Sequence, residues 1–195
     1  MTGIMDTVEM PKLHENQKSF AGIPEAVFLE EIDAYMAQPE NEENCEKVLQ
    51  RLDEQHGKYR FMAFNLEARR RKLKSQIPDL QRSLEMIDVL RKETEEERET
   101  QFLLSDQVFI KTLVPPTKTV YLWLGASVML EYPLDEAEVL LKQNMTSAIS
   151  NLKTVEHDQD FLRDQITTTE VNMARVYNWG VKKRQAAAKT AASTS

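Results

Sequence analysis

The sequence predicts a mostly helical α+β fold, in which two long helices form an antiparallel coiled-coil hairpin and two β-hairpins are inserted at the turn. Three observations predict it. Apolar residues recur at alternating intervals of three and four over about seven heptads of the first half and through most of the second, which is the repeat of a coiled-coil seam. Between these stretches the period changes to two, in segments rich in Val, Tyr and Trp that are typical of strands. The chain has only five Gly among 195 residues, which favours long helices over a loop-rich β fold.

Composition narrows the classes of protein that the chain can belong to. The net charge of −7 disfavours a general nucleic-acid binder, which needs a surplus of Lys and Arg to neutralise phosphates. The first 15 residues lack the layout of a signal peptide. The most apolar segment, 120–132, is interrupted by Gly125, Ser127 and Glu131 and is shorter than the roughly 20 apolar residues of a membrane helix. We therefore expect no membrane association and a cytoplasmic protein, and we leave the nucleus open as a second location.

The N-terminal region is expected to contain a tail and one short helix. Residues 1–20 show no sustained period, which predicts a disordered tail. Residues 21–38 carry apolar side chains at intervals of three and four, and Pro24 suits the first turn of a helix, so a short amphipathic helix is predicted there.

The first coiled-coil helix is predicted at residues 40–99, with Asn41 as a plausible N-cap. Pro78 removes a backbone hydrogen bond and is expected to kink this helix. His56, Arg70 and Arg91 occupy seam positions where apolar residues are expected, so local packing there is in question.

Residues 100–133 are predicted to form two β-hairpins, with turns near Asp106 and Gly125. Isolated hairpins are marginal in water, and exposed strand edges pair with other chains. We therefore expect this region to drive oligomerisation, with its strands pairing with equivalent strands of other subunits. The predicted assembly residues are Phe102, Leu104, Val108, Ile110, Val120, Leu122, Trp123, Leu124, Val128 and Leu130.

The second coiled-coil helix is predicted at residues 134–181, and Asp135 with Glu138 resembles a capping box at its start. Residues 182–195 are polar and of low complexity, which predicts a disordered C-terminal tail. In an antiparallel hairpin of this kind, the strands would lie at one end and both termini at the other.

This order of elements resembles the α-type subunits of the prefoldin family. The resemblance covers about residues 20–184 and is carried by seven short segments: Gly22-Ile-Pro-Glu-Ala-Val-Phe28, Leu52-Asp-Glu-Gln55, Val114-Pro-Pro-Thr117, Leu122-Trp-Leu-Gly-Ala126, Val128-Met-Leu-Glu-Tyr132, Phe161-Leu-Arg-Asp-Gln165 and Thr167-Thr-Thr-Glu-Val-Asn-Met-Ala-Arg-Val-Tyr-Asn-Trp179.

The resemblance implies a chaperone subunit in a heterohexamer of two α-type and four β-type subunits, whose strands build a double β-barrel. It implies capture of non-native proteins, notably actin and tubulin, at the coiled-coil tips and their transfer to the cytosolic chaperonin, without ATP. It also suggests the von Hippel–Lindau protein as a partner.

Several apolar side chains near the expected tips exceed what a two-helix seam can bury, and exposed apolar groups normally mark a binding surface. The alternative is that they pack in the seam or against the short N-terminal helix. The candidate client-binding residues are Leu49, Leu52, Tyr59, Phe61, Met62, Met173, Val176, Tyr177 and Trp179.

No enzyme is predicted. Cys45 is the only cysteine, and His14, His56 and His157 have no ligand spacing, so we expect no metal site. Gly125-Ala-Ser127 is not a nucleophile elbow, and no Gly-rich phosphate loop is present, so we expect no catalytic site and no cofactor.

Two other functions remain open beside the chaperone. A coiled-coil adaptor or scaffold with fixed partners would fit the same architecture. A nucleic-acid-binding arm is disfavoured by the charge, and the basic segment 69–74 is better explained as a solvated helix face. The basic residues 182–184 could contact an acidic partner.

Overall fold

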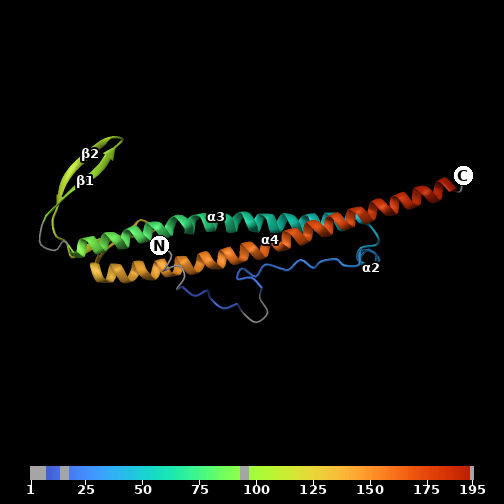
Figure 1. Ribbon diagram of the computed structural model, residues 1–195, viewed down its shortest axis with the longest axis horizontal. Coiled ribbons are helices and arrows are strands. Elements are labelled where there is room, and N and C mark those ends of the chain that lie inside the picture. The colour runs from blue at the N-terminus through green and yellow to red at the C-terminus, as the bar shows by residue number, and fades with distance from the viewer. Residues whose placement is uncertain (1–7, 14–17, 93–96, 194–195) are drawn as a thin grey trace. The chain divides into compact units, whose positions relative to one another are not determined.

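The computed structural model describes residues 8–13, 18–92 and 97–193 (Figure 1). Its elements, in order, are α2 (Ile32–Met36), α3 (Cys45–Lys92), β1 (Arg98–Ser105), β2 (Val108–Val114), β3 (Thr119–Gly125), β4 (Val128–Pro133) and α4 (Leu134–Ser193). The prediction of a mostly helical chain with two β-hairpins between two long helices is confirmed. Contacts divide the chain into two units, one containing Lys72–Asn151 and the other Met10–Arg71 with Leu152–Ser195.

The unit that contains Lys72–Asn151 holds both hairpins and one end of each long helix. Its buried core joins Ile87 of α3 to Leu134, Ala137 and Leu141 of α4. The β3–β4 hairpin closes this core with three half-buried side chains, Val120, Leu122 and Tyr132.

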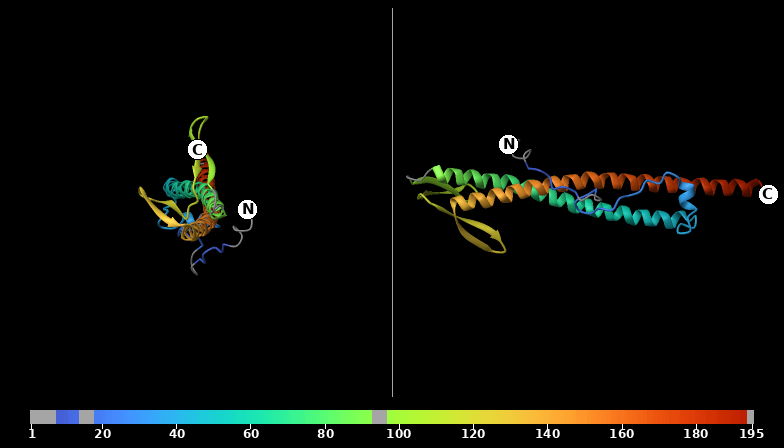
Figure 2. Two further views of the ribbon diagram at one scale, coloured as in Figure 1. Left: turned by 90° about the vertical axis from the view of Figure 1, so that its left-hand side faces the viewer. Right: turned by 90° about the horizontal axis from the view of Figure 1, so that it is seen from below.

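The two hairpins are built alike, and each is a separate two-stranded antiparallel sheet. Phe102 lies opposite Ile110 in the first, and Leu122 lies opposite Leu130 in the second. The register shifts just before each turn, between Leu103 and Ser105 and between Trp123 and Gly125, which are equivalent positions. Figure 2 shows the hairpins, in yellow-green and yellow, projecting in different directions.

In the unit that contains Met10–Arg71 and Leu152–Ser195, α3 and α4 pack antiparallel. His56 contacts Glu170 and Arg70 contacts Glu156, so residue numbers rise along one helix as they fall along the other. Two buried clusters hold the pair together. One contains Met36, Val48, Leu52 and Val176, and the other contains Ile23, Tyr59 and Leu162.

The N-terminal segment differs from the prediction. Of residues 21–38, only Ile32–Met36 are helical, and residues 22–31 run as extended chain beside α4 (Figure 1). Apolar residues at intervals of three fit one edge of an extended chain as well as one face of a helix. The extended form prevails because side chains of α4 satisfy its backbone polar groups.

The predicted boundaries of the long helices and tails are also corrected. Arg98 and Glu99 pair with Val114 and Leu113 in β1, so the first helix ends before them, at Lys92. Pro78 lies inside α3, which continues through it. The second helix continues to Ser193 instead of ending at 181, because the Ala-rich tail has a high helix propensity.

The tails predicted at 1–20 and 182–195 are therefore ordered in part. Ser19 is buried and Phe20 is hydrogen-bonded to α4, whereas residues 1–7, 14–17 and 194–195 lie outside the described residues.

Candidate interaction surfaces

The two hairpins expose apolar side chains on both of their faces. We call these side chains the hairpin surface. Trp123 is 63% exposed, although Trp is one of the largest apolar side chains. Monomeric soluble proteins rarely expose contiguous apolar surface of this kind, and such a surface is typical of a contact with another chain. The exposed apolar residues are Phe102, Leu103, Leu104, Val108, Phe109, Ile110, Leu113, Tyr121, Trp123, Leu124, Val128, Met129 and Leu130.

Eight of the ten predicted assembly residues belong to this surface. The other two, Val120 and Leu122, are half-buried against the helices of their own unit. The sequence reasoning missed Leu103, Phe109, Leu113, Tyr121 and Met129, because it followed mainly one alternating set of side chains. The signal was present in the sequence, because apolar residues occupy both odd and even positions of these strands, and alternate side chains of a strand point to opposite faces.

The candidate tip residues divide into covered and exposed side chains. Leu52, Tyr59 and Val176 are buried, which favours the interpretation that they belong to the core. Phe61 and Tyr177 are 68% and 56% exposed. The remaining four, Leu49, Met62, Met173 and Trp179, are half-buried against the two clusters of this unit.

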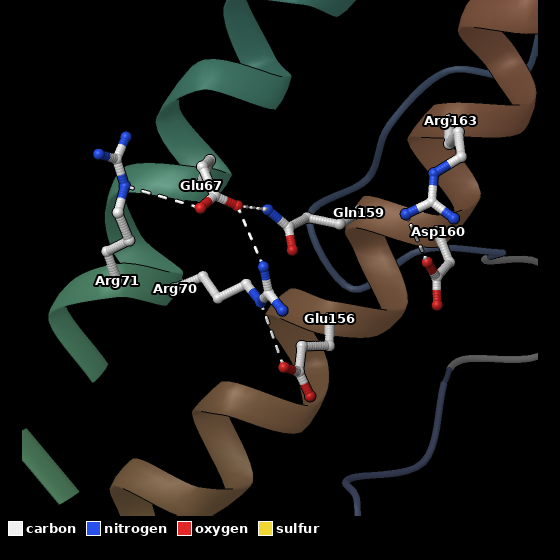
Figure 3. A network of polar contacts seen from close by, with 7 residues as sticks. All are labelled: Glu67, Arg70, Arg71, Glu156, Gln159, Asp160 and Arg163. Carbon is white, nitrogen blue, oxygen red and sulfur yellow. Dashed lines mark hydrogen bonds and ion pairs between the residues drawn. The ribbon is translucent and has the colours of Figure 1, made fainter. Parts of the chain in front are cut away.

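Arg70, a charged residue at a predicted seam position, lies in a network of polar side chains between the helices (Figure 3). Its Nε lies 3.2 Å from Glu156 Oε1, and its Nη1 lies 3.4 Å from Glu67 Oε2. Gln159 Nε2 also donates to Glu67 Oε2 at 2.9 Å. The hydrogen bond to Glu156 raises the pKa of Arg70, and the hydrogen bond from Gln159, assisted by Arg70 and Arg71, lowers the pKa of Glu67.

The other two polar seam residues are also paired. Arg91 Nη2 lies 2.8 Å from Asp135 Oδ1 and 2.5 Å from Glu138 Oε2. Hydrogen bonds from Lys142 and then Arg91 lower the pKa of Glu138. His56 Nε2 lies 3.0 Å from Glu170 Oε1. The polar side chains at these three seam positions are therefore accommodated by pairs with residues of the facing helix.

A fourth feature, which the sequence reasoning missed, is a row of polar residues on α4 that holds residues 18–33. Asp158, Gln165, Asn172 and Trp179 recur at intervals of seven, and each bonds to the N-terminal segment. Asp158, Gln165 and Asn172 are buried. The sequence did contain a signal for a third segment packed on the two long helices, because these polar residues recur at heptad spacing beside the apolar seam.

No group of three or more metal-ligating side chains gathers within the described ranges. Over the same ranges, no helix is both long enough and apolar enough to cross a membrane.

Comparison with known proteins agrees with the order of elements. The family model described as Prefoldin subunit matches residues 59–179. A protein of Drosophila melanogaster named prefoldin subunit 3 is 89% identical over 194 residues, which cover 100% of this chain and 99% of the relative. The Homo sapiens protein of that name is 55% identical over 165 residues, covering 84% and 83%. The Saccharomyces cerevisiae protein of that name is 38% identical over 192 residues, covering 93% of each.

Proposed function

The chain belongs to the prefoldin subunit family, whose members are subunits of a chaperone complex, and we propose that it is an α-type subunit of a heterohexamer with two α-type and four β-type subunits. The hairpin surface carries this proposal. Two hairpins with apolar side chains on both faces have too little partner surface within their own unit, and strands of neighbouring subunits closing a β-barrel would cover them.

The complex captures non-native proteins, actin and tubulin among them, and passes them to the cytosolic chaperonin without using ATP. Phe61 and Tyr177 support the capture step, because they are large aromatic side chains that the seam leaves exposed. The von Hippel–Lindau protein is a further proposed partner, and the cytoplasm, with the nucleus as a second location, is the proposed place of action.

Co-expression with β-type and α-type partner subunits tests the assembly. We expect a stable species with the mass of a hexamer that suppresses the aggregation of actin diluted from denaturant. A monomer or homodimer without suppression would overturn the proposal. A hexamer that binds one folded partner and suppresses no aggregation would instead support the adaptor function.

Substitutions of Phe61 and Tyr177 test the capture step separately from assembly. The double substitution Phe61→Ser with Tyr177→Ser should weaken suppression severalfold while the hexamer still forms. Lys58→Gln, an exposed polar change on the same helix, is the control and should change neither measurement. Unchanged suppression by the double variant would exclude these two residues from client binding.

A further inference from the structure

Residues 18–31, which we call the strap, contact the rest of their unit with a period of three residues. Within residues 23–30, each third N–H group donates and each third carbonyl accepts. The donors to α4 are the N–H groups of Ala26 and Leu29, and the acceptors are the carbonyls of Pro24, Val27 and Glu30. The Ile23 N–H, three positions before Ala26, donates instead to Ser19 Oγ within the strap. A three-residue period without internal ladder bonds is the repeat of the polyproline II helix.

Side chains of α4, and one side chain of α3, form hydrogen bonds with the main chain of the strap. Gln165 Oε1 accepts from the Ala26 N–H at 2.8 Å. Asn172 uses both amide atoms, since its Oδ1 accepts from Leu29 at 3.0 Å and its Nδ2 donates to the Val27 carbonyl at 2.8 Å. Tyr59 of α3 donates to the Pro24 carbonyl at 2.9 Å. These contacts reach only main-chain atoms of the strap.

The strap is also fixed at both of its ends. The two oxygens of Asp158 accept from the N–H groups of Phe20 and Ala21 at 2.7 and 2.8 Å. At the other end, Arg175 Nη2 donates to the Glu30 carbonyl at 2.7 Å, and its guanidinium carbon lies 5.1 Å from the centroid of the Phe28 ring.

The repeats of the helix and the strap match in length. Seven residues of α-helix, the distance from Gln165 to Asn172, rise by about 10 Å. Three residues of polyproline II, the distance from Ala26 to Leu29, rise by about 9 Å. One heptad of α4 therefore presents one amide side chain to each turn of a polyproline II chain.

The side chains of the strap take little part in this recognition. Within residues 23–30, only the side chain of each third residue is covered: Ile23 is buried, and Ala26 and Leu29 are half-buried in the two clusters. Val27, between Ala26 and Leu29, is 75% exposed. Outside this stretch, Ser19 is buried and the Phe20 ring packs against the His157 ring.

We call the surface that holds the strap, formed by Asp158, Gln165, Asn172 and Arg175 of α4 and Tyr59 of α3, the groove. Its hydrogen bonds select main-chain geometry, and its apolar contacts select an apolar residue at each third position.

We infer that this groove of α4 is a binding site for a non-native polypeptide in the polyproline II conformation, and that the strap occupies it in cis until a client replaces it. Polyproline II is a major conformer of unfolded chains, so recognition of its main chain fits ligands of many sequences. This inference rests on the proposed function: it assigns client binding to the groove and its regulation to the strap.

Release of the strap tests the inference. Ile23→Asp places a charge among Tyr59 and Leu162 and should free the strap without altering α4. The probe is fluorescently labelled, reduced and carboxymethylated α-lactalbumin, and its binding is measured with the full-length chain, alone and with its co-expressed partner subunits. If the strap closes the groove most of the time, the variant should bind the probe about tenfold or more tightly than the unsubstituted chain.

Two competing peptides test whether the groove binds its ligand through main-chain hydrogen bonds. An unlabelled peptide of residues 22–31 should displace the probe from the Ile23→Asp chain. The same peptide with N-methyl groups at the positions of Ala26 and Leu29 lacks both donors and should compete at least about tenfold less well. Equal competition by the two peptides would overturn recognition through the main chain.

Hydrogen exchange of the unsubstituted chain is a second test, which does not depend on the folding of the Ile23→Asp variant. Excess α-lactalbumin probe should accelerate exchange at the Ala26 and Leu29 amides, because it displaces the strap. Unchanged exchange with bound probe would overturn the inference. Assembly and suppression of actin aggregation could persist in that case, so the proposed function would stand without it.

Discussion

Gly180 of α4 lies so close to Cys45 of α3 that a β-carbon at position 180 would be 2.7 Å from Cys45 Sγ and 3.2 Å from its Cβ. Cys45 Sγ also lies 3.5 Å from the Val176 carbonyl oxygen, one turn earlier in α4. The glycine therefore allows the two helices to approach closely at this end of their contact. Glycine in a helix interior otherwise costs about 1 kcal/mol relative to Ala.

Gly180→Ala should consequently destabilise the chain despite the better helix propensity of Ala. Overpacking of this kind typically costs about 1–3 kcal/mol, which exceeds the propensity gain. The same substitution in a Cys45→Ala background should be neutral or stabilising, because Sγ is gone. Chemical denaturation of the four chains in this double-mutant cycle measures the coupling, and additive effects would contradict the close contact.

Asn172→Leu should loosen the strap. The substitution leaves the part-buried Leu29 N–H and Val27 carbonyl without their partner. The cost should be about 1 kcal/mol, the lower end of the range for fully buried groups. We expect a lower unfolding midpoint and faster hydrogen exchange at the Leu29 amide. Asn178→Leu, on an exposed face of the same helix, should change neither quantity noticeably. Retained protection of the Leu29 amide in the Asn172 variant would contradict the role assigned to this side chain.

A charge on the hairpin surface should prevent subunit assembly. Phe102→Asp places a carboxylate on β1 where we propose that a neighbouring subunit packs, and we expect the hexamer mass to be lost from co-expressed material. Gln101→Asp adds the same charge at the adjacent polar position, opposite Lys111, and should be tolerated. Equal assembly of the two variants would show that Phe102 lies outside the interface.

The Arg70 network predicts a dependence of stability on pH. Because the folded-state pKa of Glu67 is lowered, ionised Glu67 stabilises the fold above the ordinary glutamate pKa. That contribution is lost as the pH falls through the lowered value. Glu67→Gln should therefore flatten the decline of the thermal midpoint at acidic pH. A decline as steep as that of the unsubstituted chain would contradict this role of Glu67.

Much of the fold could be predicted from local patterns. The change of period between residues 92 and 101, and its return at Leu134, indicated the two hairpins between the two long helices. Periodicity is a local property, since a coiled-coil seam or a strand face repeats along a few neighbouring residues. The apolar residues of 120–132 also predicted a contact with another chain there, although they did not indicate that Val120 and Leu122 pack against the helices of their own unit.

What the sequence by itself determined was the order of the elements, the two hairpins and the family to which the chain is similar. Only the tertiary structure decided the conformation of the strap, the burial of Leu52, Tyr59 and Val176, and the close approach of Gly180 to Cys45. The physical reason lies in where the partners are. The Ala26 N–H finds its acceptor on Gln165, 139 positions along the chain, and apolar residues at intervals of three suit a helix or an extended segment equally well until that acceptor is in place.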